Sequence, residues 1–329
     1  MTNPLDILQM ARGFFASRII LTAAELKLFE KLPADVQTLV KENDWNIEAL
    51  TMLMDVLTAM EILDKKDDIY KLRTPLEKAL SNDPEASVVP MIAHMNNLWD
   101  KWSKLSNIVR KGRITDVPIS ISKDKDAMPL FIGAMHTVGK GMAETLVPKL
   151  LPVNAKKMLD VGGASGTYAI EFLNQIPELS VTLFDLPEVI PLAEERISRH
   201  QLSHRVTLFP GNYYEDKFPE GHDLVWLSAV IHQNSQKQNQ ELYKKCFDAL
   251  VPGGIIWIRD HVINEDRTKP PGGAIFAINM LVATAGGSTY TLDEISHDLE
   301  LAGFVSPKVI HHGENMDSVV AAVKSSLNT

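Results

Sequence analysis

From Lys157 onwards the chain alternates between apolar runs and helical segments, and this alternation constrains the fold more than any other feature. Continuous apolar strands between helices are typical of a parallel sheet covered on both faces. The last two strands, FVSPKVIHHG and SVVAAVKS, are joined so closely that they form a hairpin, and the final strand therefore runs antiparallel. The other strands are KMLDVGG, SVTLFDLP, RVTLFPG, DLVWLSAV and GGIIWIRDHVI, with helices predicted at 167–175, 188–199, 236–250 and 291–302.

The first strand of this region ends in a glycine-rich loop, Asp160-Val161-Gly162-Gly163-Ala164-Ser165-Gly166, that leads into a helix. Glycines at such a turn let the backbone bend sharply and approach a ligand closely. The dinucleotide pattern G-x-G-x-x-G fits no frame. The methyltransferase pattern fits through Asp160, Gly162 and Gly166, with Gly163 inside the loop and Ala164 at the usual middle glycine. The alternative is a tight turn that binds nothing.

The end of the second strand carries a carboxylate at a spacing that suits a nucleoside. Asp185 lies 19 residues after Gly166, where it can accept hydrogen bonds from both ribose hydroxyls, with Leu186 beside it. Asn212, after the third strand, is placed to meet the adenine amino group, and Tyr213 to stack on the ring. The alternative for Asn212 and Tyr213 is a turn residue and a packed aromatic.

His232 follows the fourth strand, and Asp260 ends the fifth strand 28 residues later. Ligands of open α/β sheets bind at this edge, and neighbouring strands are about 4.8 Å apart. We therefore expect Asp260 to hydrogen-bond His232 and to fix its tautomer for general base catalysis. A phenol and an unperturbed imidazole differ in pKa by about 3.5 units, or about 4.8 kcal/mol. An acidified acceptor or late proton transfer reduces that cost, and a packed histidine is the alternative.

A second group of residues is predicted to line the acceptor pocket. The uncharged run from Pro270 to Leu292 has a strongly apolar centre, Ala274 to Ala285, that is too short to span a bilayer, so the run is expected to be a buried wall. Histidines 136, 232 and 261 show no HxH or HxxxH spacing, so no metal site is predicted. The proposed contact residues are Phe131, Met135, His136, His261, Asn279 and Met280.

The region before the sheet reads as a separate helical domain. Residues 5–80 are mostly helical, and a short hairpin at 62–72 follows the helices, which is typical of a winged-helix unit used in dimerisation or DNA binding. Two further helices are expected at 91–113 and 127–150. We place the boundary between residues 113 and 114. The domains are therefore 1–113 for dimerisation and 114–329 for catalysis.

Charge and cysteine content limit the partners. Residues 1–113 carry 15 basic and 16 acidic residues, and the remainder carries 18 basic and 26 acidic, giving a net charge of −9. An acidic domain repels phosphate backbones, which argues against nucleic acid as the main partner. The single cysteine, Cys246, cannot form an internal disulfide, and no signal peptide is visible at the start, so a cytoplasmic location is expected.

Taken together, these motifs make the chain similar to the small-molecule O-methyltransferases that include plant caffeate and flavonoid, hydroxyindole and microbial antibiotic enzymes. The similarity is carried by ARGFFASRIILTAAELKLFEKL, LDVGGASGTYAIEF, LFDLPEVI, FDALVPGGIIWIRDHVI and LDEISHDLELAGF. It implies a class I methyltransferase (Rossmann-like) sheet whose last strand is antiparallel, preceded by a helical winged-helix dimerisation domain. It also implies a homodimer, S-adenosylmethionine as cofactor, and His232 as the base.

Several positions depart from the pattern of these enzymes. The plant motif His-Asp-Trp is His232-Gln233-Asn234 here, and the orienting acid is Asp260 where glutamate is common. A second glutamate of these enzymes falls near Thr289, where this chain has no acid. A cofactor-side lysine four residues before the histidine is Ser228. These departures affect the catalytic residues more than the cofactor loop.

The favoured hypothesis is methyl transfer from S-adenosylmethionine to a hydroxyl of a small aromatic or conjugated acceptor, with no membrane or nucleic-acid partner. One alternative is an enzyme of the same fold that methylates carbon or uses the cofactor for hydroxylation or decarboxylation. Another is a winged-helix regulator with a ligand-sensing domain. Identity of the acceptor does not follow from the sequence.

Overall fold

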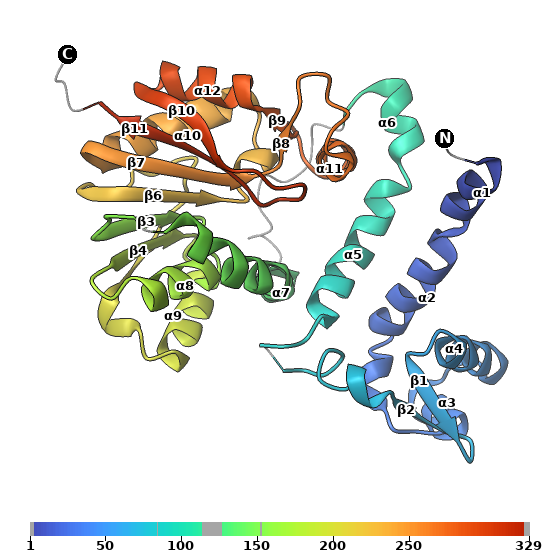
Figure 1. The fold of residues 1–329 in the computed structure, drawn as a ribbon. Coiled ribbons are helices and arrows are strands. Elements are labelled where there is room, and N and C mark those ends of the chain that lie inside the picture. Colours follow the sequence, from blue (N-terminus) through green and yellow to red (C-terminus); the bar gives the residue numbers. More distant parts are fainter. Residues whose placement is uncertain (1–2, 84, 114–126, 152, 326–329) are drawn as a thin grey trace. The chain divides into compact units, whose positions relative to one another are not determined.

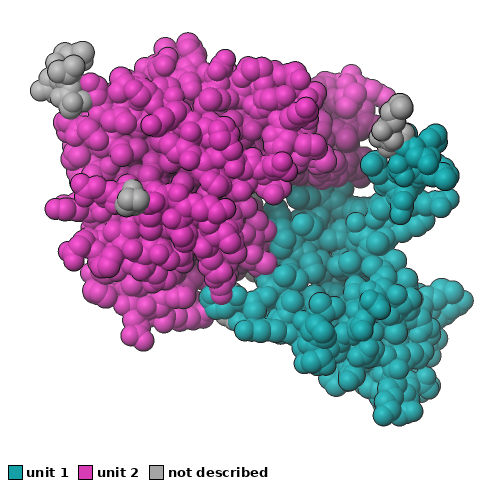
Figure 2. All heavy atoms as spheres, in the orientation of Figure 1, with its two compact units in different colours: residues 1–100 teal, residues 101–329 magenta. Residues whose placement is uncertain are grey.

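The computed structural model describes residues 3–83, 85–113, 127–151 and 153–325 of the 329-residue chain. The chain forms two compact units, Met1–Asp100 and Lys101–Thr329 (Figure 2). The boundary expected from the sequence, between residues 113 and 114, falls within the second unit.

The first unit consists of helices, an antiparallel hairpin and, after the hairpin, most of the helix α5 (Val89–Trp102). Asp67 and Asp68 form the tip of the hairpin with φ of 50° and 61°, the left-handed conformation that suits a two-residue turn. Leu28, Met54 and Tyr70 are fully buried in the core between these elements. The elements are α1 (Pro4–Arg12), α2 (Phe14–Glu25), α3 (Val36–Asn43), α4 (Ile47–Ala59), β1 (Leu63–Lys66) and β2 (Ile69–Leu72).

The second unit is built on a seven-stranded sheet of order β10-β11-β7-β6-β3-β4-β5 (Figure 1). The strands β3 to β7 pair in parallel, whereas β11 lies between β7 and β10 and is antiparallel to both. The predicted sheet with an inserted antiparallel last strand is therefore confirmed. The strands are β3 (Lys157–Val161), β4 (Ser180–Asp185), β5 (Val206–Pro210), β6 (His222–Ser228), β7 (Leu250–Asp260), β10 (Phe304–His311) and β11 (Ser318–Lys324).

Helices cover both faces of this sheet, as continuous apolar strands require. Trp226 and Trp257 point into the core shared with α7 and α8, whereas Val225 and Ile256 point into the core shared with α10 and α12. Successive residues of one strand therefore serve opposite faces. The helices are α7 (Ala127–Leu146), α8 (Thr167–Gln175), α9 (Ile190–Arg199), α10 (Gln236–Ala249), α11 (Pro271–Ala283) and α12 (Leu292–Leu301).

Two segments differ in detail from the sequence-based expectation. The single helix expected at 91–113 is two helices, α5 (Val89–Trp102) and α6 (Leu105–Lys111), separated by a turn at residues 103–104. The uncharged run from Pro270 to Leu292 forms α11, a loop and a short strand, β9 (Tyr290–Thr291), which pairs with β8 (Val262–Ile263). Within the described residues, no helix combines the length and apolarity needed to span a membrane.

Candidate active site

The glycine-rich loop is a tight turn between β3 and α8 that is held against β4. Gly162 and Gly166 have φ of 68° and 79°, and Gly162 N donates to Phe184 O at 2.8 Å. At Gly163 a Cβ would lie 2.7 Å from Leu183, so only glycine fits there. Ala164 has a φ of 49°, which a glycine at this position would adopt without strain.

Asp185 ends β4, and its side chain holds the glycine-rich loop in place. Its carboxylate accepts hydrogen bonds from Ala164 N and Leu186 N, each at 2.7 Å. Burial raises the pKa of Asp185 to about 6, against the lowering effect of these two backbone donors. Each carboxylate oxygen keeps a second lone pair, so the group can still accept from a diol.

Asp160 is a carboxylate with unmet bonding capacity. It is 2% exposed, and its Oδ2 has no hydrogen-bond partner in the described structure. This oxygen faces Gly163, whose Cβ position would lie 2.9 Å away. Burial, and secondarily the charge of Asp185, raise the pKa of Asp160 to about 8. At neutral pH the raised pKa keeps this group mostly protonated, and a cationic ligand beside it would favour the ionised form.

Ser228 lies at the end of β6 and accepts a 2.7 Å hydrogen bond from Arg259 Nε of β7. The Arg259 guanidinium is buried and also donates to Met316 O at 2.6 Å and to Met142 Sδ at 2.8 Å. It lies over the Tyr168 ring at 4.9 Å. A buried cation therefore adjoins the position where the related enzymes carry a lysine, although sequence analysis did not single it out.

Tyr213 connects the expected adenine site to the catalytic loop. Its hydroxyl accepts from Gln233 Nε2 at 3.0 Å and donates to Tyr214 Oη at 3.1 Å. The side chain of Asn212 instead accepts from Tyr214 N, which is the turn geometry considered as its alternative. Tyr213 is thus fixed in place by a residue that departs from the family pattern, Gln233.

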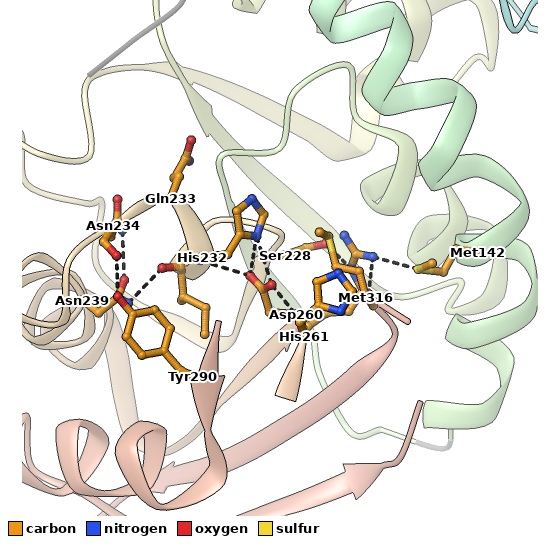
Figure 3. A network of polar contacts seen from close by, with 12 residues as sticks. Met142, Ser228, His232, Gln233, Asn234, Asn239, Asp260, His261, Tyr290 and Met316 are labelled. Atoms are coloured by element: carbon orange, nitrogen blue, oxygen red, sulfur yellow. Dashed lines mark hydrogen bonds and ion pairs between the residues drawn. The ribbon is translucent and has the colours of Figure 1, made fainter. Parts of the chain in front are cut away.

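His232 and Asp260 form the predicted pair. His232 Nδ1 lies 2.9 Å from both carboxylate oxygens of Asp260, on the adjacent strand end (Figure 3). The Asp260 side chain is 1% exposed and that of His232 is 12% exposed. Burial would raise the pKa of Asp260, but the His232 imidazole and His261 N–H outweigh it, so this pKa is lowered. The carboxylate is ionised and orients the ring with Nε2 directed away from it.

The backbone around His232 is braced from two sides. Asn239 Nδ2 donates to Ile231 O at 3.0 Å, and Ser288 N donates to His232 O at 2.8 Å. Gly287 lies so close that a Cβ there would be 2.3 Å from His232 O. His232 itself lies in a short 3-10 turn, Ile231–Gln233. The position of the imidazole is therefore determined by the loop that follows α11 as well as by Asp260.

Phe276 of α11 packs against two imidazoles. Its ring centroid lies 4.9 Å from that of His232, edge to face, and 4.7 Å from that of His261. Sequence analysis named His261 but missed Phe276, which lies within the uncharged run and carries no motif. Its spacing of three residues before Asn279 was the available signal, since these positions share a helix face.

The two residues proposed as contacts on α11 are already engaged. Asn279 Oδ1 accepts from Trp102 Nε1 at 2.9 Å. Met280 is buried, and its carbonyl accepts from Arg113 Nη1 at 3.2 Å, as does Thr284 O at 3.1 Å. Arg113 thus pairs with carbonyls at the carboxyl end of α11, and its positive charge interacts favourably with the helix dipole there.

The residues proposed on α7 lie beside the cofactor loop. His136 Nδ1 is 2.9 Å from Thr167 Oγ1, at the first residue of α8. Phe131 packs into a small apolar cluster that also contains Ala164 and Leu186. Met135 is half-buried on the same helix. Of the residues proposed to line the acceptor pocket, Phe131 therefore lies beside the cofactor loop. His261 instead lies near His232, since both imidazoles pack on Phe276.

Thr289, near which the sequence comparison places a second glutamate, has no carboxylate. Thr289 is 1% exposed, and its hydroxyl has no hydrogen-bond partner among the described residues. The described residues contain no group of three or more histidine, cysteine, aspartate or glutamate side chains that could hold a metal ion.

Comparison with known proteins fits this arrangement. The O-methyltransferase domain family matches residues 102–305, and the O-methyltransferase dimerisation domain matches residues 8–82. This chain belongs to the O-methyltransferase family. Family membership confirms the predictions of fold class, of O-methyltransferase activity and of S-adenosylmethionine as the cofactor.

The names of similar O-methyltransferases state the compounds on which those enzymes act. The 3-hydroxy-5-methyl-1-naphthoate 3-O-methyltransferase of Streptomyces sahachiroi is 28% identical, over 98% of this chain and 96% of that protein. Acetylserotonin O-methyltransferase of Gallus gallus is 25% identical, over 96% of each. The crystal structure of human N-acetylserotonin methyltransferase with its cofactor shares the fold, with a TM-score of 0.82, 23% identity and 99% coverage of both chains.

Proposed function

We propose that this O-methyltransferase methylates a hydroxyl group of a small aromatic or conjugated acceptor, with His232 as general base oriented by Asp260. The observation that carries the proposal is the 2.9 Å contact of His232 Nδ1 with a buried, ionised carboxylate at the ligand-binding edge of the sheet. The names of the related naphthoate and acetylserotonin enzymes support an aromatic acceptor.

The residues of the glycine-rich loop fit S-adenosylmethionine. Glycines at positive φ leave the backbone of the loop open to the methionyl group, and the orphaned carboxylate of Asp160 suits a cationic ligand. The carboxylate of Asp185 suits ribose hydroxyls. The residues proposed to hold the cofactor are Asp160, Gly162, Gly163, Gly166, Asp185, Leu186, Asn212, Tyr213 and Ser228. When bound, S-adenosylmethionine supplies an electrophilic methyl group on a sulfonium centre.

His232 and Asp260 handle the proton of the acceptor. Because Asp260 accepts from Nδ1–H, Nε2 keeps its lone pair and receives the hydroxyl proton. The imidazolium that results lies beside the ionised carboxylate, which stabilises the positive charge. The acceptor oxygen, made anionic, is then the nucleophile for the in-line displacement. Hydrogen bonds to the backbone fix His232 and Asp260 before any acceptor binds, so little free energy is spent on orienting the two side chains during the reaction.

Apolar walls support the chemistry by excluding water. On and beside α11, the residues proposed to line the acceptor pocket are Phe276, Met280 and His261. The side chain of Asn279, on the same helix, is held by its hydrogen bond from Trp102. An anionic oxygen and a cationic sulfonium lose charge as they react, so a dry pocket disfavours the reactants more than the transition state.

The proposal is tested with cofactor that carries a ¹³C-labelled methyl group. The enzyme is incubated with a panel of phenolic and heteroaromatic acceptors, and the products are analysed by carbon NMR and mass spectrometry. We expect a labelled methyl ether and an equal amount of S-adenosylhomocysteine. A carbon-bound methyl, or a product oxidised or decarboxylated without label, would instead support the alternative chemistry of the same fold.

We also propose that the enzyme is a homodimer formed through its first unit. The match to a dimerisation domain supports this, and so do the exposed apolar side chains of α1 and α2. Leu5, Met10 and Phe15 are 68%, 73% and 56% exposed. Light scattering should report twice the mass of 36.6 kDa. A monomeric mass at micromolar concentration would contradict the proposal.

A further inference from the structure

His261 is the second imidazole at the proposed acceptor site, and the base mechanism does not use it. It follows Asp260 directly, and its ring packs on the Phe276 ring that also contacts His232. Figure 3 shows both imidazoles beside the Asp260 carboxylate. Asp260 pairs with the side chain of His232, whereas from His261 it accepts only the backbone N–H, at 2.8 Å. The side-chain nitrogens of His261 are therefore left for another partner.

The His261 ring is unusual because it is deeply buried and yet has unpaired hydrogen-bonding nitrogens. His261 is 7% exposed, and its Nδ1 is buried without a hydrogen bond among the described residues. Nε2 likewise takes part in no hydrogen bond among the described residues. Native structures rarely leave both nitrogens of a deeply placed imidazole unpaired unless a ligand or a functional role explains it. Burial, aided by the nearby Arg259 guanidinium, outweighs the carboxylates of Asp260 and Asp317 and lowers the pKa of His261. The ring is neutral at physiological pH.

The surroundings of Nδ1 determine where the single ring proton resides. Nδ1 faces the first turn of α11, since the Cβ position of Gly273 lies 3.8 Å from it. No side chain caps the N-terminus of α11, so that turn carries partial positive charge from unpaired N–H groups. A positive environment favours a nitrogen with a lone pair over a protonated one. The proton is therefore on Nε2, which makes Nε2–H a hydrogen-bond donor.

We propose that His261 binds a carbonyl oxygen of the acceptor, and that the enzyme prefers hydroxyarenes in which this carbonyl lies ortho or peri to the hydroxyl. The inference rests on the proposed function and specifies its substrate class. His232 then takes the proton of the hydroxyl, while His261 donates to the neighbouring carbonyl. The two imidazoles, packed on one phenyl ring, suit two oxygens on one aromatic system.

This pairing also meets the energetic difficulty of deprotonating a phenol. A hydroxyl beside a carbonyl is locked in an internal hydrogen bond, which holds its proton away from an external base. A donor from His261 replaces that internal bond at the carbonyl oxygen and frees the proton. Because the carbonyl is conjugated with the ring, the charge that develops on the phenol oxygen spreads onto the oxygen that His261 contacts. A neutral imidazole serves here without repelling the imidazolium of His232.

The test compares 1-hydroxyanthraquinone, whose carbonyl is peri to the hydroxyl, with 2-hydroxyanthraquinone, whose carbonyls are remote. Dissociation constants are measured by calorimetry for the full-length enzyme saturated with S-adenosylhomocysteine. We expect the wild type to bind the peri isomer about 2- to 10-fold more tightly, the worth of one hydrogen bond. His261→Phe should abolish this preference, and His261→Gln, which keeps a donor near the position of Nε2, should retain part of it.

A matched control is His222→Phe. His222 also has a buried Nδ1 without a hydrogen bond among the described residues, but it lies at the opposite end of β6. That variant should keep the preference of the wild type. Thermal unfolding and S-adenosylhomocysteine affinity verify that each variant is folded. Equal binding of the two isomers by the wild type, or no binding of either, overturns the inference, as does an undiminished preference in His261→Phe. Because these readouts involve no methyl transfer, they are independent of the labelled-methyl experiment that tests the proposed function.

Discussion

His232 Nδ1 lies 2.9 Å from each oxygen of Asp260, a carboxylate that is ionised although only 1% of its side chain is exposed. Asp260→Asn removes the charge, and its amide donates to Nδ1, which moves the ring proton to Nε2 and removes the base. We expect kcat to fall by about 10² to 10⁴. Asp260→Glu keeps the charge and should retain more activity. Steady-state kinetics of the two variants give the comparison, and equal rates for asparagine and glutamate would argue against the role.

Asp160 should make stability and cofactor affinity depend on pH. Its pKa rises from 3.8 when unfolded to about 8 in the native protein, so the native state binds the extra proton between these values. Stability without cofactor therefore falls as pH rises through this interval, by up to about 1.4 kcal/mol per pH unit from this group. Affinity for cationic S-adenosylmethionine should rise over the same interval, with release of a proton.

Asp160→Asn is the variant that isolates this effect. Its melting temperature without cofactor should decline less with pH than that of the wild type, while its affinity for S-adenosylmethionine should be lower. Calorimetry in two buffers of different ionisation enthalpy counts the protons released. If wild type and variant show the same pH dependence, Asp160 is not the group responsible.

Much of this site could be predicted from the sequence because its parts occupy strand ends. Asp185 and Asp260 each end a parallel strand and Asp160 lies one residue before the end of another, and the carboxyl ends of such strands meet at one edge. The pairing of His232 with Asp260 was expected if their two strands were neighbours, and β6 and β7 do pair in parallel. The antiparallel direction of β11 could be predicted because the segment that joins it to β10 is too short for anything but a hairpin.

Other parts of the site had no local signal. Arg259 and Asp260 are neighbours in the chain but serve opposite faces of β7, and only the fold shows that Arg259 meets Ser228. Trp102 and Arg113 reach α11 across more than 160 residues of sequence. The helix expected at 91–113 is interrupted because a turn at Lys104 separates two shorter helices, and apolar spacing alone did not reveal that turn.

Gly287 should be required for the position of the catalytic histidine. In Gly287→Ala the new methyl group would lie 2.3 Å from His232 O, so the loop must move away. A displacement of about 1 Å at reacting groups can cost about 100-fold in rate, and we expect a loss of kcat of that size. Gly141→Ala, in α7 with no atom within 4 Å of the new Cβ, is the control and should keep full activity. Full activity in Gly287→Ala would show that the bracing loop is dispensable.

Tyr213 and Gln233 should act together in cofactor binding. Tyr213→Phe and Gln233→Ala each remove the 3.0 Å hydrogen bond between them, so each should raise the Kd for S-adenosylhomocysteine about 2- to 10-fold. Tyr213→Ala also removes the ring, and stacking on a base contributes about 1 to 3 kcal/mol, so its effect should be larger. Calorimetry of the double variant Tyr213→Phe/Gln233→Ala should give no more than the single effect. Additive effects would exclude the coupling.

Single-turnover methyl transfer by His232→Ala tests the central claim most directly. Enzyme saturated with S-adenosylmethionine is mixed with an acceptor, and formation of the methyl ether is followed in time. We predict a rate about 10² to 10⁴ lower than that of the wild type, with an unchanged Kd for the cofactor. A rate equal to that of the wild type, with the cofactor bound normally, would contradict the assignment of His232 as the base.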